Sequence, residues 1–266
     1  MGFYQSVIGK LLERNLIGST DRVLVICAGS TDRQAFLDHD FKNVVISNLI
    51  THGGVSDYSP YLWEYQDAEA INHEDAAFDW VFVHAGLHHC ASPHKSLCEM
   101  LRVASKGVAV FEARDSTLLR IASKFSLVPE YELEPVVLSD GKNGGLRDSC
   151  IPNYVYRWTE REVEKTVNSY SPEYVHGFSY HYNYRIPNER LTMSPSAIKR
   201  FVARLAKIVV PVLKAILPKQ GNEFAFTVTK QGSLQPWLLE QGDEIVANME
   251  YMQQHFRPDN YKADDS

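Results

Sequence analysis

Short apolar runs alternate with amphipathic stretches between residues 22 and 113. Residues 22–27 are apolar after the first position, as expected for a strand buried on both faces of a parallel sheet. Residues 92–104 instead place apolar side chains three and four positions apart, which predicts a helix packed on that sheet. The expected strands are 22–27, 44–47, 63–66, 78–84 and 107–112, and the expected helices are 31–39 and 92–104. This alternation predicts an α/β domain with a doubly wound, mostly parallel sheet.

The second half of the chain has a different character. Residues 130–158 are rich in glycine and proline, and a capping-box pattern starts a helix at 159–170. We expect strands at 174–184 and 223–230, the second as an antiparallel edge, a long helix at 196–217 and a closing helix at 236–256. The resulting division of one overall domain is an N-terminal helix (1–20), a core (21–115), a cap (116–222) and a final strand and helix (223–266).

Charge and cysteine content narrow the function classes. The 27 Lys and Arg against 33 Asp and Glu give a net charge of −6, so we expect no nucleic-acid partner. The four cysteines show no regular spacing, which favours a reducing, cytoplasmic location over a disulfide framework. The longest apolar stretch, 208–217, is too short to span a bilayer.

The loop at 27–31 is the first candidate ligand site. In an open parallel sheet, ligands bind outside the carboxyl ends of the strands, and this loop follows the first strand. A dinucleotide site would favour G-x-G-x-x-G, but the loop keeps only Gly29. A nucleoside ligand without phosphates needs fewer glycines, and its carboxylate can use the free N–H groups at the start of the next helix.

Two motifs resemble the class I S-adenosylmethionine-dependent methyltransferases of the methyltransferase-11 type. Residues 23–31 match V-L-D-[IV]-G-C-G-[TS]-G, and residues 78–107 match F-D-x-V…L-H-H-x-x-x-P…E-x-x-R-V-L-K-P-G-G. The agreeing positions are Phe78, Asp79, Leu87, His88, His89, Pro93, Glu99, Arg102, Val103, Lys106 and Gly107. The resemblance covers about residues 20–115 and implies a Rossmann-like, seven-stranded methyltransferase fold with S-adenosylmethionine as cofactor.

The resemblance also implies cofactor-binding positions. The methionine and ribose would meet Ala28, Gly29 and Ser30, with Asn48 in place of the usual acidic residue at the ribose. The adenine would meet Asp67 and Ala68, and the sulfonium would lie over His84 and Ala85. Val25, Cys27 and Thr31 depart from the first motif, as does Asn48 from the usual acid, which keeps a non-catalytic interaction module open as an alternative.

Histidines and aromatic residues supply the remaining candidates. His84 and His88 are candidate general bases for a hydroxyl acceptor, whereas His89 is expected to shape its loop. We expect no metal site, because His84, His88, His89, His94 and Cys90 come from a strand end, a loop and a helix start. The expected substrate-binding residues of the cap are Arg114, Tyr154, Tyr156 and Trp158.

The expected acceptor is a small molecule, a glycan or a lipid-linked molecule, methylated at oxygen. A nicotinamide-dependent oxidoreductase is a second alternative, disfavoured by the missing glycines. Residues 196–219 carry six Lys and Arg and no acid among regularly spaced apolar residues. This basic amphipathic pattern predicts peripheral contact with an anionic membrane surface, although packing on the protein's own domain is the commoner use of such a helix.

Overall fold

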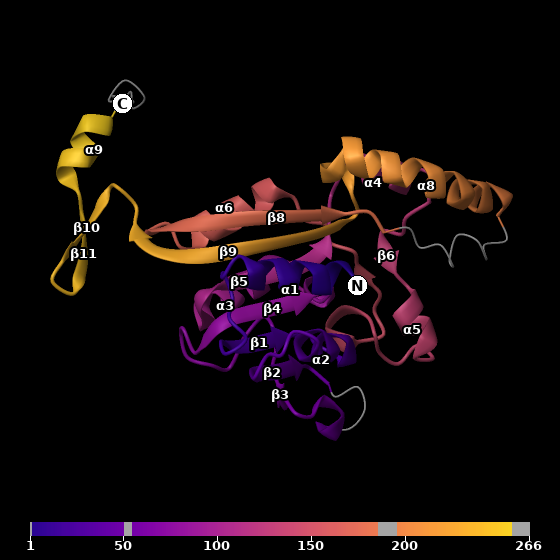
Figure 1. Ribbon diagram of the computed structural model, residues 1–266, viewed down its shortest axis with the longest axis horizontal. Coiled ribbons are helices and arrows are strands. Elements are labelled where there is room, and N and C mark those ends of the chain that lie inside the picture. Colours follow the sequence, from indigo (N-terminus) through magenta and orange to yellow (C-terminus); the bar gives the residue numbers. More distant parts are fainter. Residues whose placement is uncertain (1, 51–54, 186–195, 257–266) are drawn as a thin grey trace, which may run out of the picture.

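The computed structural model describes residues 2–50, 55–185 and 196–256, without the side chains of residues 198, 199 and 202. Seven strands form one sheet in the order β3-β2-β1-β4-β5-β9-β8 (Figure 1). Their bounds are β1 (Arg22–Ile26), β2 (Asn43–Asn48), β3 (Leu62–Tyr65), β4 (Phe78–His84), β5 (Ala104–Ala113), β8 (Tyr174–Asn183) and β9 (Glu223–Leu234). The strands β1 to β5 are parallel, and β9 is antiparallel to both of its neighbours.

Helices cover both faces of the sheet, which confirms the predicted doubly wound fold. In β1, Leu24 and Ile26 point into the core beneath α3 (Pro93–Val103) and α6 (Glu160–Tyr170). The alternate residues Val23 and Val25 pack under α1 (Phe3–Glu13) and α2 (Ser30–Leu37). Both sets are buried, which explains why the strand reads as a continuous apolar run.

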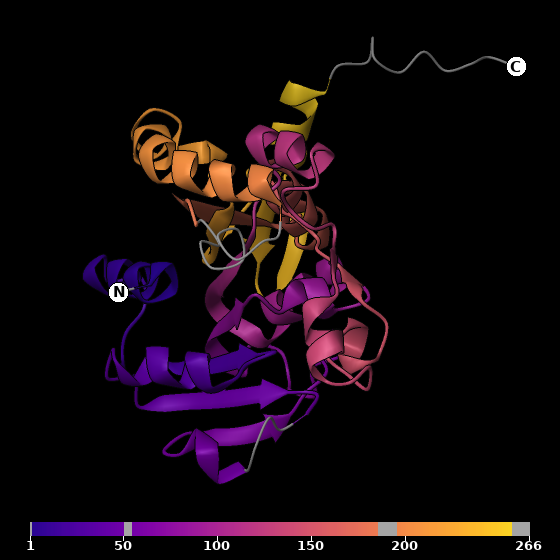
Figure 2. The same ribbon diagram turned by 90° about the vertical axis from the view of Figure 1, so that its right-hand side faces the viewer.

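Several shorter elements lie outside the sheet. Residues 114–158 contribute α4 (Thr117–Lys124), β6 (Tyr131–Glu132), α5 (Glu134–Leu138) and β7 (Asn153–Tyr154), and β6 pairs with β7. The predicted capping box starts α6, where the Thr159 hydroxyl accepts from the Glu162 N–H group. The long helix α8 (Ala197–Ile216) follows β8 and contains Pro211. Figure 2 shows α8 (orange) and α1 (indigo) on the same side of the molecule, with α8 higher in the view.

Two predictions for the last third of the chain are wrong. The strand β9 lies inside the sheet between β5 and β8, so β8 is the edge strand. The predicted helix at 236–256 is instead a hairpin, β10 (Leu238–Gln241) and β11 (Glu244–Ala247), followed by the short α9 (Met249–His255). Gly242 has a φ of +67° and begins the two-residue turn, which interrupts any helix. The hairpin and α9 project from the body of the protein (Figure 1).

Candidate functional site

A cavity of about 270 Å³ lies at the carboxyl ends of β1 to β4. We call it the cofactor cavity. Four of the predicted cofactor residues line it: Asn48, Asp67, Ala68 and Ala85. It is also lined by residues that the sequence did not single out for this site, namely Cys27, Leu49, Ile50, Glu69, Gly86, His89, Cys90, Pro135, Gly144, Gly145, Arg147 and Asp148.

The loop after β1 leaves the sheet sharply. Cys27 has a φ of +52°, and the Ala28 N–H group donates to the Ser47 carbonyl at 2.9 Å. The Gly29 N–H group donates to Oδ2 of Asp32 at 2.9 Å, which closes the first turn of α2. Ala28, Gly29 and Ser30 therefore support the rim, and they are not among the residues that line the cavity.

Asn48 fixes the position of this loop. Its Nδ2 donates to the Ala28 carbonyl at 3.1 Å, and its Oδ1 accepts from the Leu49 N–H group at 2.8 Å. An acidic residue here could accept but could not donate to a carbonyl. The departure from the family motif thus gives the loop after β1 an additional hydrogen bond.

Asp67 and Glu69 form the acidic wall of the cofactor cavity and bind the same arginine. Arg147, from the glycine-rich stretch outside the sheet, pairs with Asp67 (Nη2–Oδ2, 2.5 Å) and with Glu69 (Nη1–Oε2, 2.8 Å). Glu69 is buried and also accepts from the backbone N–H groups of Ala91 and Ser92. The two ion pairs of Arg147 therefore hold its segment against the acidic wall of the cavity.

The loop that carries Asp67 is clamped by the second family motif. Oε2 of Glu99 accepts from the Ile71 N–H group at 3.0 Å. Arg102 donates to the carbonyls of Ile71 and His73 at 2.7 and 2.8 Å, and also to Glu99. The spacing Glu-x-x-Arg places both side chains on one face of α3, from which they hold the loop after β3.

We expect the Glu99 clamp to be lost in acid. The hydrogen bond from Arg102 is the main reason that the pKa of Glu99 is lower than the usual 4.5. Because the folded-state pKa is the lower one, the stabilisation is present above pH 4.5 and is lost as the pH falls through the folded-state pKa. Glu99→Gln should cost about 1 kcal/mol of unfolding free energy at pH 7.

Urea unfolding of both proteins at pH 7 and in mild acid measures this difference. The gap between wild type and Glu99→Gln should shrink as the pH falls below 4.5. A gap that stays constant over this range would show that the Glu99 charge makes no contribution.

Arg147 is expected to slow exchange of any ligand in the cofactor cavity. Arg147→Ala removes both ion pairs that hold its segment over the cavity. A half-exposed ion pair stabilises this closed arrangement by about 1 kcal/mol, which corresponds to about a fivefold change in a rate or equilibrium constant. Association and dissociation rates for S-adenosylhomocysteine, followed by stopped-flow tryptophan fluorescence, should both rise about fivefold. Arg22→Ala, at the opposite end of β1, is the control. Unchanged rates in Arg147→Ala would contradict a closing role.

His84 borders a second hollow at the same edge of the sheet. We call this the N-terminal hollow; its volume is about 460 Å³, and Gly2, Phe3, Tyr4, His84, Asn183, Tyr184, Arg185 and Glu223 line it. The His84 ring stacks on Tyr4 with centroids 4.3 Å apart. Its Nδ1 lies 3.7 Å from Oδ1 of the buried Asp32, whose pKa is raised by burial. His84 is half-buried and keeps a face toward the hollow.

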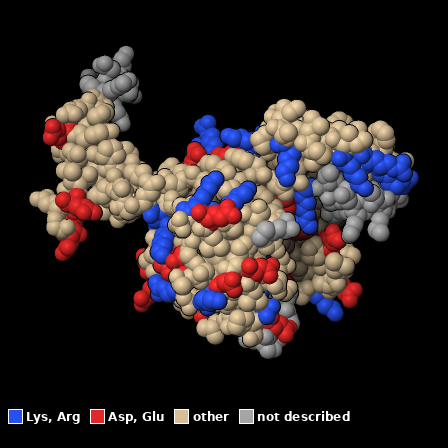
Figure 3. All heavy atoms as spheres, in the orientation of Figure 1, with Lys and Arg blue, Asp and Glu red and all other residues tan. Residues whose placement is uncertain are grey.

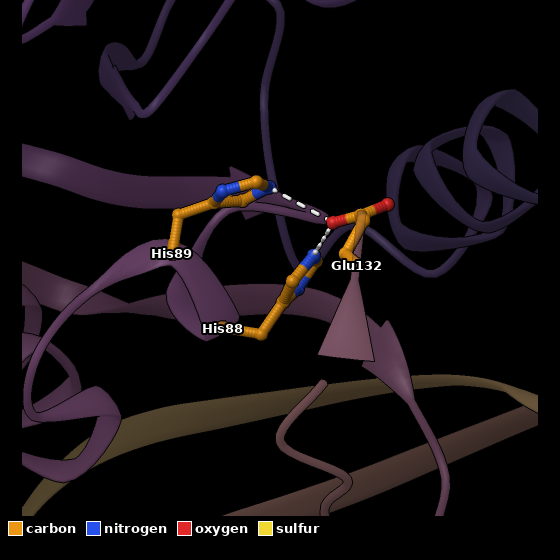
Figure 4. Close-up of side chains that lie close together, drawn as sticks. All are labelled: His88, His89 and Glu132. Atoms are coloured by element: carbon orange, nitrogen blue, oxygen red, sulfur yellow. Dashed lines mark ion pairs between the residues drawn. The ribbon is translucent and has the colours of Figure 1, made fainter. Parts of the chain in front are cut away.

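His88 is held between two carboxylates. Its Nδ1 lies 2.7 Å from Oε2 of Glu112. Its Nε2 lies 3.4 Å from Oε2 of Glu132, as Figure 4 shows. Burial alone would lower the pKa of His88, but the charge and hydrogen bond of Glu112, together with Glu132, raise it to about 10. Both ring nitrogens of His88 thus face carboxylates, and His88 does not line the cofactor cavity, which argues against its expected role as a general base.

His89 shares the same carboxylate. Its Nε2 lies 3.4 Å from Oε2 of Glu132, and its ring centroid lies 4.5 Å from that of His88. Burial, reinforced by the charge of His88, lowers the pKa of His89. The His89 side chain is 32% exposed, against 10% for His88, and only His89 lines the cofactor cavity.

The predicted substrate residues divide into two pairs. Tyr154 and Tyr156 line a third cavity, of about 420 Å³, together with Asp115, Leu119, Arg120, Ser123, Lys124, Glu130, Arg157 and Glu162. Trp158 is fully buried in the core, and Arg114 is buried with both Glu160 oxygens 2.7 Å from its Nη2. Arg114 and Trp158 therefore do not line the cofactor cavity, the N-terminal hollow or this third cavity, contrary to the expectation that they bind substrate.

Comparisons with known proteins agree with this architecture. Residues 54–111 match the family model described as a methyltransferase domain, and no curated protein matches the sequence. The structure is similar to the YcgJ protein from Bacillus subtilis, with a TM-score of 0.51 and 11% identity over 85% of this chain and 97% of that chain. It is also similar to a SAM-dependent methyltransferase from Archaeoglobus fulgidus, with a TM-score of 0.50 and 10% identity over 86% and 95% of the two chains.

At this identity the structural likeness shows the shared fold. Together with the match of residues 54–111 to a methyltransferase domain, it supports the Rossmann-like fold of the class I S-adenosylmethionine-dependent methyltransferases, as the sequence motifs predicted. S-adenosylmethionine is the cofactor that this family implies. The residues present fit it, because the cavity combines a carboxylate at Asp67 with apolar walls at Leu49, Ile50 and Ala68.

Proposed function

We propose that this chain is an active methyltransferase that methylates an oxygen atom of a small-molecule, glycan or lipid-linked acceptor. The observation that supports it is the position of the β4 end. Ala85 and Gly86 line the cofactor cavity, whereas the preceding residue, His84, lines the N-terminal hollow. One strand end thus borders both the cofactor cavity and a polar hollow that offers space for an acceptor.

The cofactor, when bound, supplies an electrophilic methyl group. Asp67 would accept from the adenine amine, and the loop held by Asn48 would lie along the ribose and methionine. The protein's part in the transfer is then to hold an acceptor oxygen in line and to exclude water, which can supply most of the acceleration. His84 would accept the hydroxyl proton, with Asp32 as a positioning residue for its ring.

Calorimetric titration of the purified protein tests the cofactor site. S-adenosylmethionine and S-adenosylhomocysteine should bind in the micromolar range, and NADH should not. Binding of NADH alone would favour the oxidoreductase alternative. No binding of any of the three would overturn the proposal and favour the non-catalytic interaction module.

Transfer itself is tested with S-adenosylmethionine labelled in its methyl group. Label should enter the sugar-containing or lipid fraction of a cell extract with the wild-type protein. His84→Ala should reduce the rate about a hundredfold, the usual size of a general-base effect, whereas His94→Ala should not. His94 is the control because it packs on Tyr156 and Trp158, away from both the cofactor cavity and the N-terminal hollow.

We further propose that α8 contacts an anionic membrane surface. Its large apolar side chains are exposed, with Phe201 at 64%, Ile208 at 73% and Ile216 at 69%. The nearby Arg204, Lys207 and Lys214 are exposed cations, and Figure 3 shows basic side chains gathered over this helix. The exposed apolar face could enter the acyl-chain region of a membrane, while the cations beside it would pair with the anionic headgroups.

The position of α8 connects this surface with the site. It follows the end of β8 at the edge where the parallel strands of the sheet also end (Figure 1). A membrane contact there would bring a lipid-linked acceptor to the mouth of the site. No helix among the described residues is long and apolar enough to cross a bilayer.

Sedimentation with vesicles tests the membrane contact. The protein should sediment with anionic vesicles at low salt and not with neutral ones. A Lys207→Glu, Lys214→Glu double variant should lose at least about thirtyfold in partitioning, because two cations at about 1 kcal/mol each contribute about 2 kcal/mol. Equal behaviour on both vesicle types, or in both proteins, would overturn this part of the proposal.

A further inference from the structure

The histidine pair and the glutamate described above share a geometry that methyl transfer does not require. His88 and His89 come from the turn after β4, whereas Glu132 lies on β6, more than forty residues later in the chain. Ligand atoms of the three residues lie within 4.8 Å of one another. Figure 4 shows both imidazole rings directed at the Glu132 carboxylate.

We propose that His88, His89 and Glu132 bind a first-row divalent cation, with Zn²⁺ the best match. Both histidine Nε2 atoms lie 3.4 Å from the same oxygen of Glu132. Ligand atoms about 2.0–2.1 Å from a tetrahedral zinc are separated by roughly 3.4 Å. Two imidazoles and one carboxylate favour zinc and its neighbours over Mg²⁺, which prefers oxygen ligands.

Outer contacts orient two of the three ligands. His88 Nδ1 is hydrogen-bonded to Glu112 at 2.7 Å, so Nε2 is the atom left for a metal, and the metal would displace the Nε2 proton on binding. This is the carboxylate–histidine–metal arrangement that fixes the tautomer of metal-binding histidines. On the other side, Asn153 lies 3.5 Å from the Glu132 oxygen. The fully buried side chain of Glu112 also adds a second negative charge near the cation.

Three protein ligands leave the fourth tetrahedral position open. Structural zinc sites are usually closed by four protein ligands, whereas an open position is typical of sites that bind water or a substrate atom. His89 also lines the cofactor cavity, so the site borders the space where the proposed reaction takes place. The cation site itself does not depend on the methyltransferase activity.

Metal titration of the untagged, chelator-treated full chain tests the proposal. Zn²⁺ should bind at one equivalent per chain by calorimetry, and Co²⁺ should give the visible absorption bands of a tetrahedral site. A His89→Ala, Glu132→Ala double variant should lose at least about a hundredfold in affinity, because losing an outer contact alone costs about ten- to a hundredfold. Both side chains are half-buried, so this variant should still fold, which circular dichroism and urea unfolding would check.

His94→Ala is the matched control, since His94 is a histidine of α3 that lies outside the cluster. Its affinity for Zn²⁺ should equal that of the wild type. The proposal is overturned if the wild type binds no Zn²⁺ at micromolar concentration. It is also overturned if the double variant keeps the wild-type affinity, which would assign binding to cysteines such as Cys150. Neither outcome would bear on cofactor binding, which is measured separately.

Discussion

Asp67→Ala should weaken the binding of S-adenosylhomocysteine about ten- to a hundredfold. A hydrogen bond to a charged group contributes about 1.5–3 kcal/mol, and each 1.4 kcal/mol is tenfold in affinity. The carboxylate is already oriented, because its Oδ1 accepts from the Glu69 N–H group at 2.9 Å. Calorimetric titration of both proteins with S-adenosylhomocysteine gives the two dissociation constants.

The control for Asp67 is another aspartate of the same loop region. Asp75 pairs with Arg102 at 2.9 Å, but its side chain is 80% exposed and it does not line the cofactor cavity. Asp75→Ala should therefore leave the affinity within about twofold of wild type, since an exposed ion pair contributes little. Equal affinity in Asp67→Ala and wild type would show that the adenine is recognised by other groups.

The largest loss of stability is expected from Glu112. Its side chain is fully buried, and it accepts hydrogen bonds from both His88 Nδ1 and the Leu87 N–H group at 2.7 Å. Glu112→Ala would leave a buried imidazolium and a buried N–H group without this partner. Breaking a buried ion pair by removing one member costs about 3–5 kcal/mol, so the unfolding free energy in urea should fall by that amount.

A second variant at position 112 tests the contribution of the charge, and an alanine variant of an exposed glutamate is the control. Glu112→Gln can still accept from the Leu87 N–H group and should lose less than the alanine variant. Glu74→Ala removes an exposed glutamate and should change the unfolding free energy by no more than about 0.5 kcal/mol. A loss in Glu112→Ala no larger than that in Glu74→Ala would show that the His88–Glu112 pair does not stabilise the fold.

The elements that carry the motifs at 23–31 and 78–107 could be predicted from the sequence because their patterns are local. An apolar run of five or six residues is enough to show a buried strand, and the spacing of Glu99 and Arg102 is enough to place both on one helical face. The contacts that Glu99 and Arg102 make could not be predicted from the sequence. Its partners Ile71 and His73 lie about thirty residues earlier, and the contact exists only because α3 packs beside the loop after β3.

The hairpin at 238–247 shows a different limit. Residues 236–256 were expected to form one helix, but the apolar residues Leu238, Leu239, Ile245 and Val246 lie on two paired strands. Gly242 turns the chain with a positive φ, and Pro236 precedes the first strand. The glycine is the local signal that should have favoured a turn over a continuous helix.

The sequence by itself determined the class of fold and, through the family resemblance, the expected cofactor and four positions that line the cofactor cavity, Asn48, Asp67, Ala68 and Ala85. Only the tertiary structure decided that His84 faces Asp32, that Arg147 closes on Asp67 and that Glu132 joins the two histidines. The physical reason is the range of the interactions. Hydrophobic periodicity and strand-end position are set within a few residues, whereas Arg147 and Asp67 are 80 residues apart and meet only after the segment outside the sheet folds across the cavity.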